Sequence, residues 1–208
     1  MLAAADLPSL DAIDVLLPQT QCQRCGYADC RAYATAMCQG EAEINRCPPG
    51  GEVTRVALAA LLQRPLTPLA DDVDAYAAEH VALIGEAACI GCAACLPVCP
   101  TDAIVGASKR MHTVIAADCT GCELCILACP VDCIALQPKV TPANRVHATL
   151  AARHAQADTL RAQYRAHQQR YAQRAEAKAA AHVPKPASDK QALLADILAR
   201  AKARAATR

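Results

Sequence analysis

Three stretches in the first third of the chain place apolar residues at helical spacing. They read LDAIDVLL (10–17), RAYATAM (31–37) and VTRVALAALL (53–62), and Pro18 and Pro65 follow the first and the last of them. Apolar residues three and four positions apart share one face of a helix, and a proline inside a helix breaks it. The pattern therefore predicts three short helices, each with one apolar face.

The middle of the chain carries apolar runs that are only as long as short strands. These runs are VALI (81–84), HTVIA (112–116) and IAL (134–136). Runs of this length, bounded by turn residues, are typical of strands. Between the helices and the strands lies RPLTPLADDVD (64–74), which is rich in Pro and Asp. We interpret it as part of a linker that spans residues 64–79.

The last third of the chain predicts two helices. Residues 143–182 contain no Pro or Gly and are rich in Ala, Gln and Arg, which favours one long helix. Its narrow apolar stripe consists of Leu150, Ala157, Leu160, Tyr164 and Tyr171. A second helix follows VPKPAS (183–188) and has an apolar face. That face consists of Leu193, Leu194, Ile197, Leu198 and Ala201.

Composition changes the expectation for the core. The chain has 208 residues, 14 of them Cys, and no Phe or Trp. Large aromatic residues normally fill much of a core, so small residues and bound metal are expected to hold this fold together. Residues 1–17 have neither a basic start nor an uninterrupted apolar stretch, so they do not form a secretory signal. We therefore expect a cytoplasmic protein whose clustered cysteines bind metal.

The two ends of the chain differ in charge. Residues 1–138 hold 7 basic and 16 acidic side chains, a net charge of −9, whereas residues 139–208 hold 14 and 4, a net charge of +10. Such charges attract each other at low ionic strength. The tail is interpreted as a solvated helix, as a segment that docks to a partner or to the acidic body, or as a basic segment for anionic lipid. Nucleic-acid binding is not expected, because the tail offers only two Tyr for stacking.

A repeat of thirty residues carries most of the cysteines. Residues 89–104 (CIGCAACLPVCPTDAI) and 119–134 (CTGCELCILACPVDCI) share the pattern C-x2-C-x2-C-x3-C-P. This run is typical of bacterial ferredoxins with two 4Fe–4S clusters, in which the fourth cysteine of each run binds the other cluster. Zinc sites usually pair two C-x2-C knuckles across a longer gap, and they fit the pattern poorly.

The repeat predicts a two-cluster domain over residues 80–138 with exchanged fourth ligands. Gly91 and Gly121 allow the backbone to approach the sulfur atoms closely. One cluster is expected on Cys89, Cys92, Cys95 and Cys129. The other cluster is expected on Cys119, Cys122, Cys125 and Cys99.

A further set of four cysteines precedes the repeat. Its members are Cys22, Cys25, Cys30 and Cys47. The spacing C-x2-C-x4-C-x16-C fits either a tetrahedral zinc site or a third cubane cluster, and spacing alone leaves both open. Two cysteines, Cys38 and Cys133, have no assigned partner and are interpreted as small buried apolar residues. The histidines of the tail lack ligand spacing and are interpreted as surface residues: His147, His154, His167 and His182.

The N-terminal set occurs in a specific context. LLPQTQC-x2-CGY-x2-C, followed by INRCPPGG, resembles the iron–sulfur domain that precedes the ferredoxin domain in the B subunit of the Rnf (Rsx) ion-translocating oxidoreductase. Order and spacing match over residues 10–138. The resemblance implies a third 4Fe–4S cluster on the first four cysteines. B subunits usually begin with a transmembrane anchor, whereas this chain begins with a short acidic segment, so we expect a form without the anchor.

The expected fold is α+β, with a helical 4Fe–4S domain at 1–63, a linker at 64–79, a ferredoxin-like domain at 80–138 and a basic helical tail at 139–208. The resemblance implies a carrier of single electrons through three 4Fe–4S clusters, as a subunit of or partner to an Rnf-type complex. Expected partners are redox proteins, other Rnf subunits among them, with peripheral attachment to the cytoplasmic face of the inner membrane as one option. The chain has no motif for substrate chemistry of its own. The alternative is a freestanding soluble polyferredoxin that serves an unrelated reductase.

Overall fold

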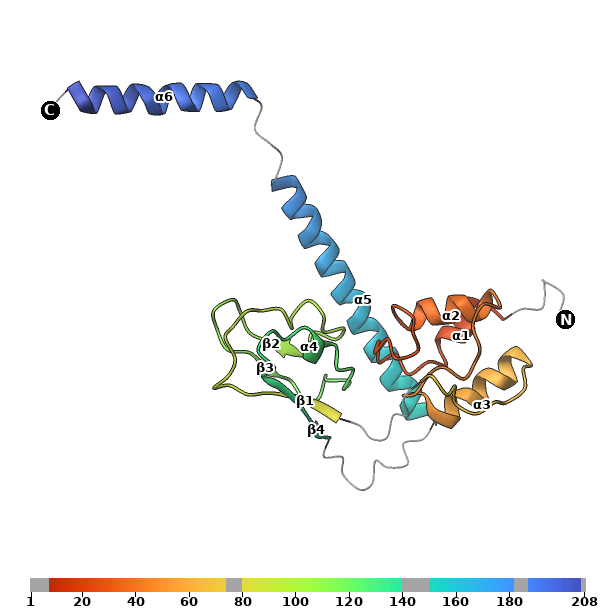
Figure 1. The fold of residues 1–208 in the computed structure, drawn as a ribbon. Coiled ribbons are helices and arrows are strands. Elements are labelled where there is room, and N and C mark those ends of the chain that lie inside the picture. The colour runs from red at the N-terminus through yellow and green to blue at the C-terminus, as the bar shows by residue number, and fades with distance from the viewer. Residues whose placement is uncertain (1–7, 74–79, 140–149, 182–186, 207–208) are drawn as a thin grey trace. The chain divides into compact units, whose positions relative to one another are not determined.

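The structure is a computed structural model that describes residues 8–73, 80–139, 150–181 and 187–206. Helices and strands are mixed, as the α+β expectation requires (Figure 1). In chain order the elements are α1 (Leu10–Asp14), α2 (Cys30–Cys38), α3 (Gly51–Leu62), β1 (His80–Ile84), β2 (Ile104–Val105), β3 (Thr113–Val114), α4 (Leu124–Leu127), β4 (Ile134–Pro138), α5 (Leu150–Ala181) and α6 (Ala187–Ala206). They form two compact units, Met1–Gln168 and Gln169–Arg208.

The first three helices begin and end where the sequence provides signals. Ser9 caps α1 by accepting a hydrogen bond from the Ala12 N–H at 3.2 Å, and Asp29 caps α2 by accepting one from the Ala32 N–H at 2.7 Å. A side-chain oxygen at this position satisfies an N–H that has no partner within the helix. Helix α3 ends at Leu62, and Gln63 after it takes a left-handed conformation two residues before Pro65. These helices match the three that the apolar pattern predicts.

The core of this helical module depends on aliphatic residues and one tyrosine. Its largest fully buried side chains include Ile13, Leu17, Met37 and Leu58. Tyr33 lies among them, and its hydroxyl donates to the Glu43 carbonyl at 2.6 Å and accepts from a backbone N–H at 3.2 Å. The shortage of aromatic residues therefore leaves the core small, and three of the four N-terminal cysteines complete it.

The first part of the interpreted linker is tied to the helical module. The Arg46 guanidinium binds the Asp72 carboxylate through two hydrogen bonds, at 2.8 and 3.2 Å. Asn45 donates to the Pro68 carbonyl at 2.8 Å, and Val73 is buried. These contacts fix residues as far as Val73, while residues 74–79 lie outside the described part of the chain.

The ferredoxin-like segment contains two small antiparallel sheets that repeat each other. Strand β1 pairs with β4, with Ile84 opposite Ile134, and β2 pairs with β3, with Ile104 opposite Val114. Adding thirty to Ile84 gives Val114, and subtracting thirty from Ile134 gives Ile104. The sequence repeat is therefore also a repeat of strand pairing. Three of these strands coincide with predicted apolar runs, whereas the apolar pattern does not predict β2.

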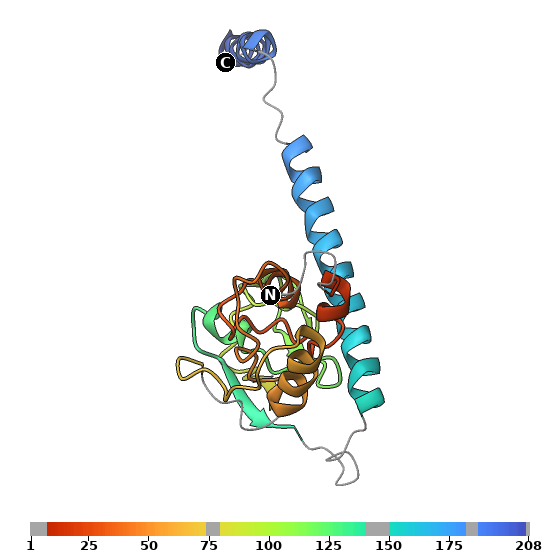
Figure 2. The same cartoon turned by 90° about the vertical axis from the view of Figure 1, so that its right-hand side faces the viewer.

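The first turns of α5 belong to the same compact unit as the cysteines, and Figure 2 shows α1 beside them. Ala157 and Leu160 are buried, as their place in the apolar stripe suggests. The interpretation of His167 as a surface residue is wrong. The residue is only 7% exposed, and its Nδ1 lies 2.7 Å from an Asp102 carboxylate oxygen. A helical pattern does not reveal a partner 65 positions away. His147 and His182 lie outside the described residues.

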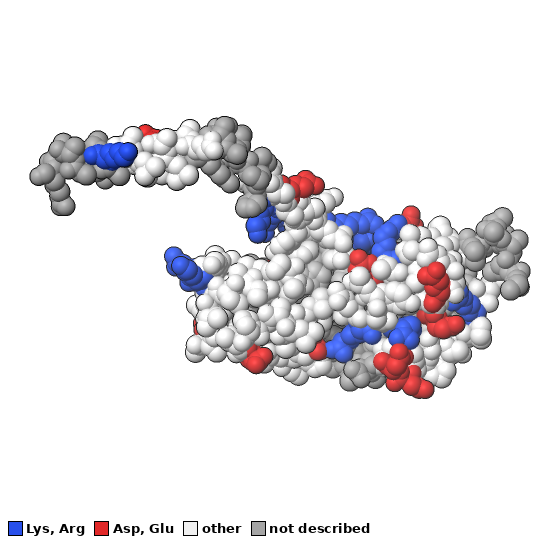
Figure 3. Space-filling model, turned by 45° about the horizontal axis from the view of Figure 1, so that its top comes forward, with Lys and Arg blue, Asp and Glu red and all other residues white. Residues whose placement is uncertain are grey.

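The body and α6 expose side chains of different kinds. In the view of Figure 3, acidic and basic side chains are interspersed over the body rather than gathered into one acidic face. In α6 four large aliphatic side chains are more than half exposed: Leu193, Leu194, Ile197 and Leu198. Among the described residues, the structure contains no helix with both the length and the apolar character needed to cross a bilayer.

Candidate iron–sulfur centres

The two cysteine runs wrap around their sites in the same backbone conformation. Gly91 and Ala93 in the first run have φ values of 68° and 62°, and Gly121 and Glu123 in the second run both have 67°. A left-handed conformation is ordinary for glycine and uncommon for alanine or glutamate. At Gly91 a side chain is also excluded by space, because a Cβ would lie 2.7 Å from the backbone nitrogen of Arg110. The tight loop that the glycines predict is therefore present in both runs.

One cavity gathers cysteines from both runs. Cysteines and aliphatic residues make up nearly all of its lining. Of its five cysteines, three belong to the first run, and Cys129 and Cys133 belong to the second. The cavity is lined by Cys89, Cys92, Cys95, Cys129, Cys133, His112, Ile84, Ile90, Val131 and Ile134. The structure thus brings together all four residues of the first predicted set.

A second cavity gathers the complementary set. Three of its cysteines belong to the second run, and Cys99 belongs to the first. The cavity is lined by Cys99, Cys119, Cys122, Cys125, Ala82, Ala103, Thr101, Thr120, Gly121, Glu123, Ile104 and Val114. Here too the four cysteines are those that the exchanged pattern predicts.

Backbone N–H groups point at several of these sulfur atoms. The Ala103 N–H donates to Cys99 Sγ at 3.2 Å, and the Ala82 N–H donates to Cys119 Sγ at 3.5 Å. At Cys129, partial burial opposes ionisation, but the N–H groups of residues 131–133 lower the pKa of the thiol. Hydrogen bonds from N–H groups stabilise a thiolate, which is the form that binds metal.

Burial makes several of the other thiols hard to ionise in the absence of metal. It raises the pKa of Cys125 to about 12, with a further contribution from the neighbouring thiolates of Cys122 and Cys119. It also raises the pKa of Cys122 to about 11, against an opposing hydrogen bond from the Leu124 N–H. Such thiols are neutral at pH 7 unless a positively charged centre replaces the proton. The chemistry of the lining therefore fits a polynuclear cationic core.

The N-terminal cysteines lie close to one another in the helical module. Burial, together with the charges of Cys22 and Cys25, raises the pKa of Cys47 to about 12. Burial also raises the pKa of Cys30, followed by the charge of Cys47. Cys25, Cys30 and Cys47 also lie in one core cluster, and the charge of Cys22 acts on all three, so the structure brings the third predicted set together. Among the described residues, no three His, Cys, Asp or Glu side chains are arranged to hold a single metal ion.

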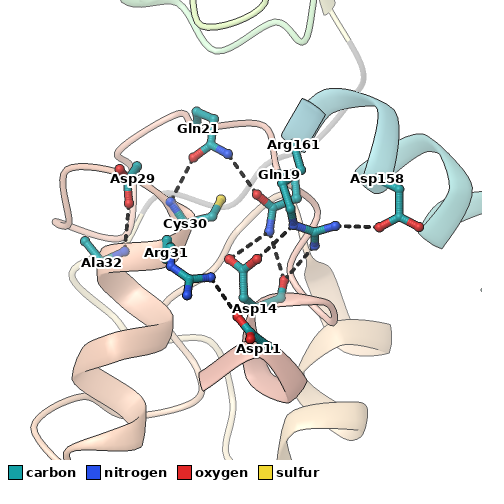
Figure 4. A network of polar contacts seen from close by, with 10 residues as sticks. All are labelled: Asp11, Asp14, Gln19, Gln21, Asp29, Cys30, Arg31, Ala32, Asp158 and Arg161. Atoms are coloured by element: carbon teal, nitrogen blue, oxygen red, sulfur yellow. Dashed lines mark hydrogen bonds and ion pairs between the residues drawn. The ribbon is translucent and has the colours of Figure 1, made fainter. Parts of the chain in front are cut away.

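A network of buried polar groups supports the loop that carries this set (Figure 4). Arg161 of α5 binds Asp14, whose carboxylate also accepts from the Gln19 amide at 3.1 Å. The Gln21 amide donates to the Gln19 side-chain oxygen at 2.8 Å, and the Gln21 oxygen accepts from the Cys30 N–H at 2.9 Å. The network therefore links the tail helix to the backbone of a candidate ligand.

The N-terminal loop also contacts the second cysteine run. Arg24 forms an ion pair with Glu123, and the Thr120 hydroxyl donates to the Thr20 carbonyl at 3.3 Å. Each of these residues lies within three positions of a candidate ligand. The N-terminal set is therefore next to the Cys119 set.

Sequence reasoning leaves two cysteines unassigned and does not consider His112. Cys38 and Cys133 are half-buried rather than fully buried. Cys38 Sγ lies 3.8 Å from the Pro8 carbonyl, whereas Cys133 Sγ lies 3.5 Å from Cys129 Sγ inside the first cavity. His112 Nδ1 lies 3.4 Å from Cys89 Sγ. The repeat offers a signal for Cys133 and His112, because each differs in chemistry from its counterpart thirty positions earlier. These counterparts are Ala103 and Ala82.

Comparison with known families agrees with the chemistry of the two regions. A family model described as a 4Fe–4S dicluster domain matches residues 82–136. A second model, described as a putative Fe–S cluster, matches residues 17–49. Together they contain every cysteine of the chain. No solved structure was found to match the chain.

Comparison with curated proteins found relatives that share one description, the B subunit of an ion-translocating oxidoreductase complex. The relative from Azoarcus sp. is 56% identical over 108 residues, which are 52% of this chain and 59% of that protein. The relatives from Hahella chejuensis and Alcanivorax borkumensis are 55% and 58% identical over 108 and 110 residues, which are 52% of this chain and 54% and 56% of theirs. The chain thus spans a little over half the length of these relatives. Over about half of the chain, these findings confirm the similarity to the B subunit of the Rnf (Rsx) ion-translocating oxidoreductase that the sequence predicted.

Proposed function

We propose that the chain is an electron carrier with three 4Fe–4S clusters, acting as a subunit of or partner to an Rnf-type complex. The proposed ligand sets are Cys22, Cys25, Cys30 and Cys47; Cys89, Cys92, Cys95 and Cys129; and Cys99, Cys119, Cys122 and Cys125. The observation that supports the proposal best is the exchange of Cys99 and Cys129 between the two cavities. Such an exchange is a feature of two-cluster ferredoxins and has no counterpart in a pair of zinc knuckles.

The clusters, when bound, supply one-electron redox chemistry, and the protein supplies ligation, hydrogen bonds and burial. Twelve cysteines act as thiolate ligands. Backbone N–H groups such as those of Ala82 and Ala103 donate to the ligand sulfur atoms and stabilise their charge. The aliphatic side chains in the walls of the two cavities, Ile84 and Ile104 among them, lower the polarity around the sites and so influence their potentials.

The contacts of the N-terminal loop support one order in space for the three proposed sets. Arg24 and Thr20 hold that loop against the second cysteine run, which carries Cys119. The second run in turn shares its ligands with the first. We infer the order N-terminal set, Cys119 set, Cys89 set, with the Cys119 set in the middle. Partner proteins would then exchange electrons with the two outer sets.

Iron content tests the number of clusters. We expect about 12 iron atoms and 12 sulfides per chain after anaerobic purification, without zinc, because twelve thiolates in three groups of four hold three cubanes. Cys30→Ser should lower the iron content by about 4 atoms, since Cys30 is a buried member of the N-terminal set. The measurement is metal analysis by mass spectrometry together with acid-labile sulfide.

Cys38→Ser is the matched control, because Cys38 belongs to the same helix and contacts only the Pro8 carbonyl among the hydrogen bonds of the described residues. It should retain the full iron content. About 8 iron atoms with one zinc in the unmodified chain would contradict the cluster assignment at the N-terminal set and leave the ferredoxin assignment intact.

Association with an Rnf-type complex is a separate part of the proposal. It rests on relatives that are named as subunits of an ion-translocating oxidoreductase complex. Affinity purification of the chain from its native cells, after separation of membranes from cytosol, should recover further subunits of such a complex. Recovery of a soluble reductase in place of those subunits would contradict this part and favour a freestanding polyferredoxin.

A further inference from the structure

The two cavities of the ferredoxin-like segment correspond to each other residue by residue. Every residue that lines the first cavity has a counterpart thirty positions away in the lining of the second. The aliphatic pairs Ile84 with Val114 and Ile134 with Ile104 preserve the character of the wall. The repeat therefore offers an internal standard against which a difference in chemistry is recognised.

The counterparts differ most where they face the ligand sulfur atoms. His112 in the first cavity corresponds to Ala82 in the second, and Cys133 corresponds to Ala103. At two other positions the second cavity is the more polar one, because Thr120 and Thr101 occupy the places of Ile90 and Val131. The hydroxyls of both threonines have backbone carbonyls in reach, at 3.3 Å and 2.8 Å. His112 is thus the largest polar group that breaks the symmetry.

The His112 ring is held in one place by close packing. The residue is 1% exposed, and its Nδ1 lies 3.4 Å from Cys89 Sγ. Its Nε2 has no hydrogen-bond partner among the described residues. Gly106 makes room for the ring, because a Cβ at this position would lie 2.1 Å from His112 Cδ2. Among the described residues, Cys89 Sγ is therefore the only hydrogen-bond partner of the imidazole.

The chemistry of the sulfur decides which nitrogen carries the proton. A metal-bound cysteine is a thiolate and accepts hydrogen bonds without donating any. Nδ1 must then be the protonated nitrogen of the neutral imidazole, while Nε2 keeps its lone pair. We infer that His112 donates an Nδ1–H hydrogen bond to Cys89 and thereby raises the reduction potential of the cluster on the Cys89 set alone.

The direction of the change in reduction potential follows from charge. One-electron reduction adds negative charge to the cluster and its thiolates, and a donor that points at a ligand sulfur stabilises the reduced form more than the oxidised form. In the second cavity the corresponding contact comes from the backbone N–H of Ala82 at 3.5 Å, without a side-chain donor at that position. The inference rests on the proposed function, because it requires a cluster on Cys89.

The test is a redox titration of the full-length protein at one fixed pH, followed by electron paramagnetic resonance. His112→Ala copies the residue of the other cavity. The variant should lower the equilibrium constant for reduction of one cluster by on the order of tenfold, which is a fall of about 59 mV in its midpoint potential for one electron. The midpoint potentials of the other two clusters should stay unchanged. The cluster that shifts should be the one whose signal depends on Cys95. His112→Asn, which can place an amide N–H near the position of Nδ1, should restore most of the potential.

Two further measurements separate a hydrogen bond from a general disturbance of packing. Gly106→Ala keeps the histidine but displaces its ring, so it should lower the same potential. In the unmodified protein with 15N-labelled histidine, pulsed resonance should detect a histidine nitrogen coupled to one reduced cluster. This measurement needs no variant that folds poorly.

The inference is overturned if no histidine nitrogen couples to a cluster, if His112→Ala leaves every potential unchanged, or if the potential that shifts belongs to the Cys119 set. Failure of the proposed function looks different, since iron would then be absent from the unmodified protein. A full iron content with unchanged potentials in His112→Ala would reject the role of His112 and retain the three clusters.

Discussion

The double variant Cys129→Ala, Cys133→Ala is expected to lose the cluster on Cys89, Cys92 and Cys95, although Cys129 belongs to the other run. Cys129 is the only member of the second run's C-x2-C-x2-C-x3-C pattern that lines the first cavity. Cys133 is removed as well, because its sulfur lies 3.5 Å from that of Cys129 and can take over as a ligand. Iron should fall from about 12 to about 8 atoms per chain, and the resonance signals of the Cys119 set should persist.

Two single variants complete this experiment. Cys133→Ala alone should keep all three clusters, since Cys129 remains in place. Cys99→Ala should remove the other ferredoxin cluster, because Cys99 lines the second cavity. Loss of the cluster on Cys119, Cys122 and Cys125 in the double variant would show that each run binds its own cluster, which would reject the exchanged assignment.

The ferredoxin-like segment is the part that sequence predicts best, because its repeat expresses one local geometry twice. The spacing of cysteines and glycines corresponds to a loop of fixed conformation. The exchange of Cys99 and Cys129 between the cavities agrees with the ligand sets that the repeat predicts. Strand β2 (Ile104–Val105) escapes the apolar pattern because two residues form no apolar run. The repeat contains the missing signal, since subtracting thirty from the run at 134–136 leads to it.

The helical module is only partly predictable from its sequence. The caps and apolar faces predict the helices, but Gln19, Gln21 and Gln23 all have positive φ values, of 58°, 54° and 60°. Left-handed backbone is uncommon for glutamine, so no residue type signals this loop in advance. The surrounding network determines the conformation, because the Gln19 and Gln21 side chains are buried and bonded to one another.

Contacts between distant parts of the chain are the least predictable feature. Asp14 and Arg161 are 147 positions apart, and their ion pair follows only from the packing of α5. The charge difference between body and tail predicts attraction of some kind, but it does not select these two residues. His167 shows the same limit, because its partner Asp102 lies in a loop far away along the chain.

Replacing Arg161 by Met is expected to release the first turns of α5 from the body. The Arg161 and Asp14 side chains are 13% and 6% exposed, with Nε 2.8 Å from the carboxylate oxygen. Removing one partner of a buried ion pair leaves an uncompensated charge and costs about 3–5 kcal/mol. We expect the low end of this range, because the Gln19 amide still donates to Asp14. Hydrogen exchange followed by mass spectrometry should then show protection of residues 150–168 reduced by roughly 100-fold.

Arg165→Met is the matched control, because it removes the same charge one turn further along α5 at an exposed position. It should leave protection within a few fold of the unmodified chain. Combining Arg161→Met with Asp14→Asn should recover part of the loss, since the second change removes the unpaired charge.

The same variants report on the first cysteine loop, because the network continues from Asp14 to the Cys30 N–H. Exchange in Cys30 and its neighbours should therefore rise with Arg161→Met and not with Arg165→Met. Equal protection in the two single variants would mean that the ion pair does not hold α5 in place.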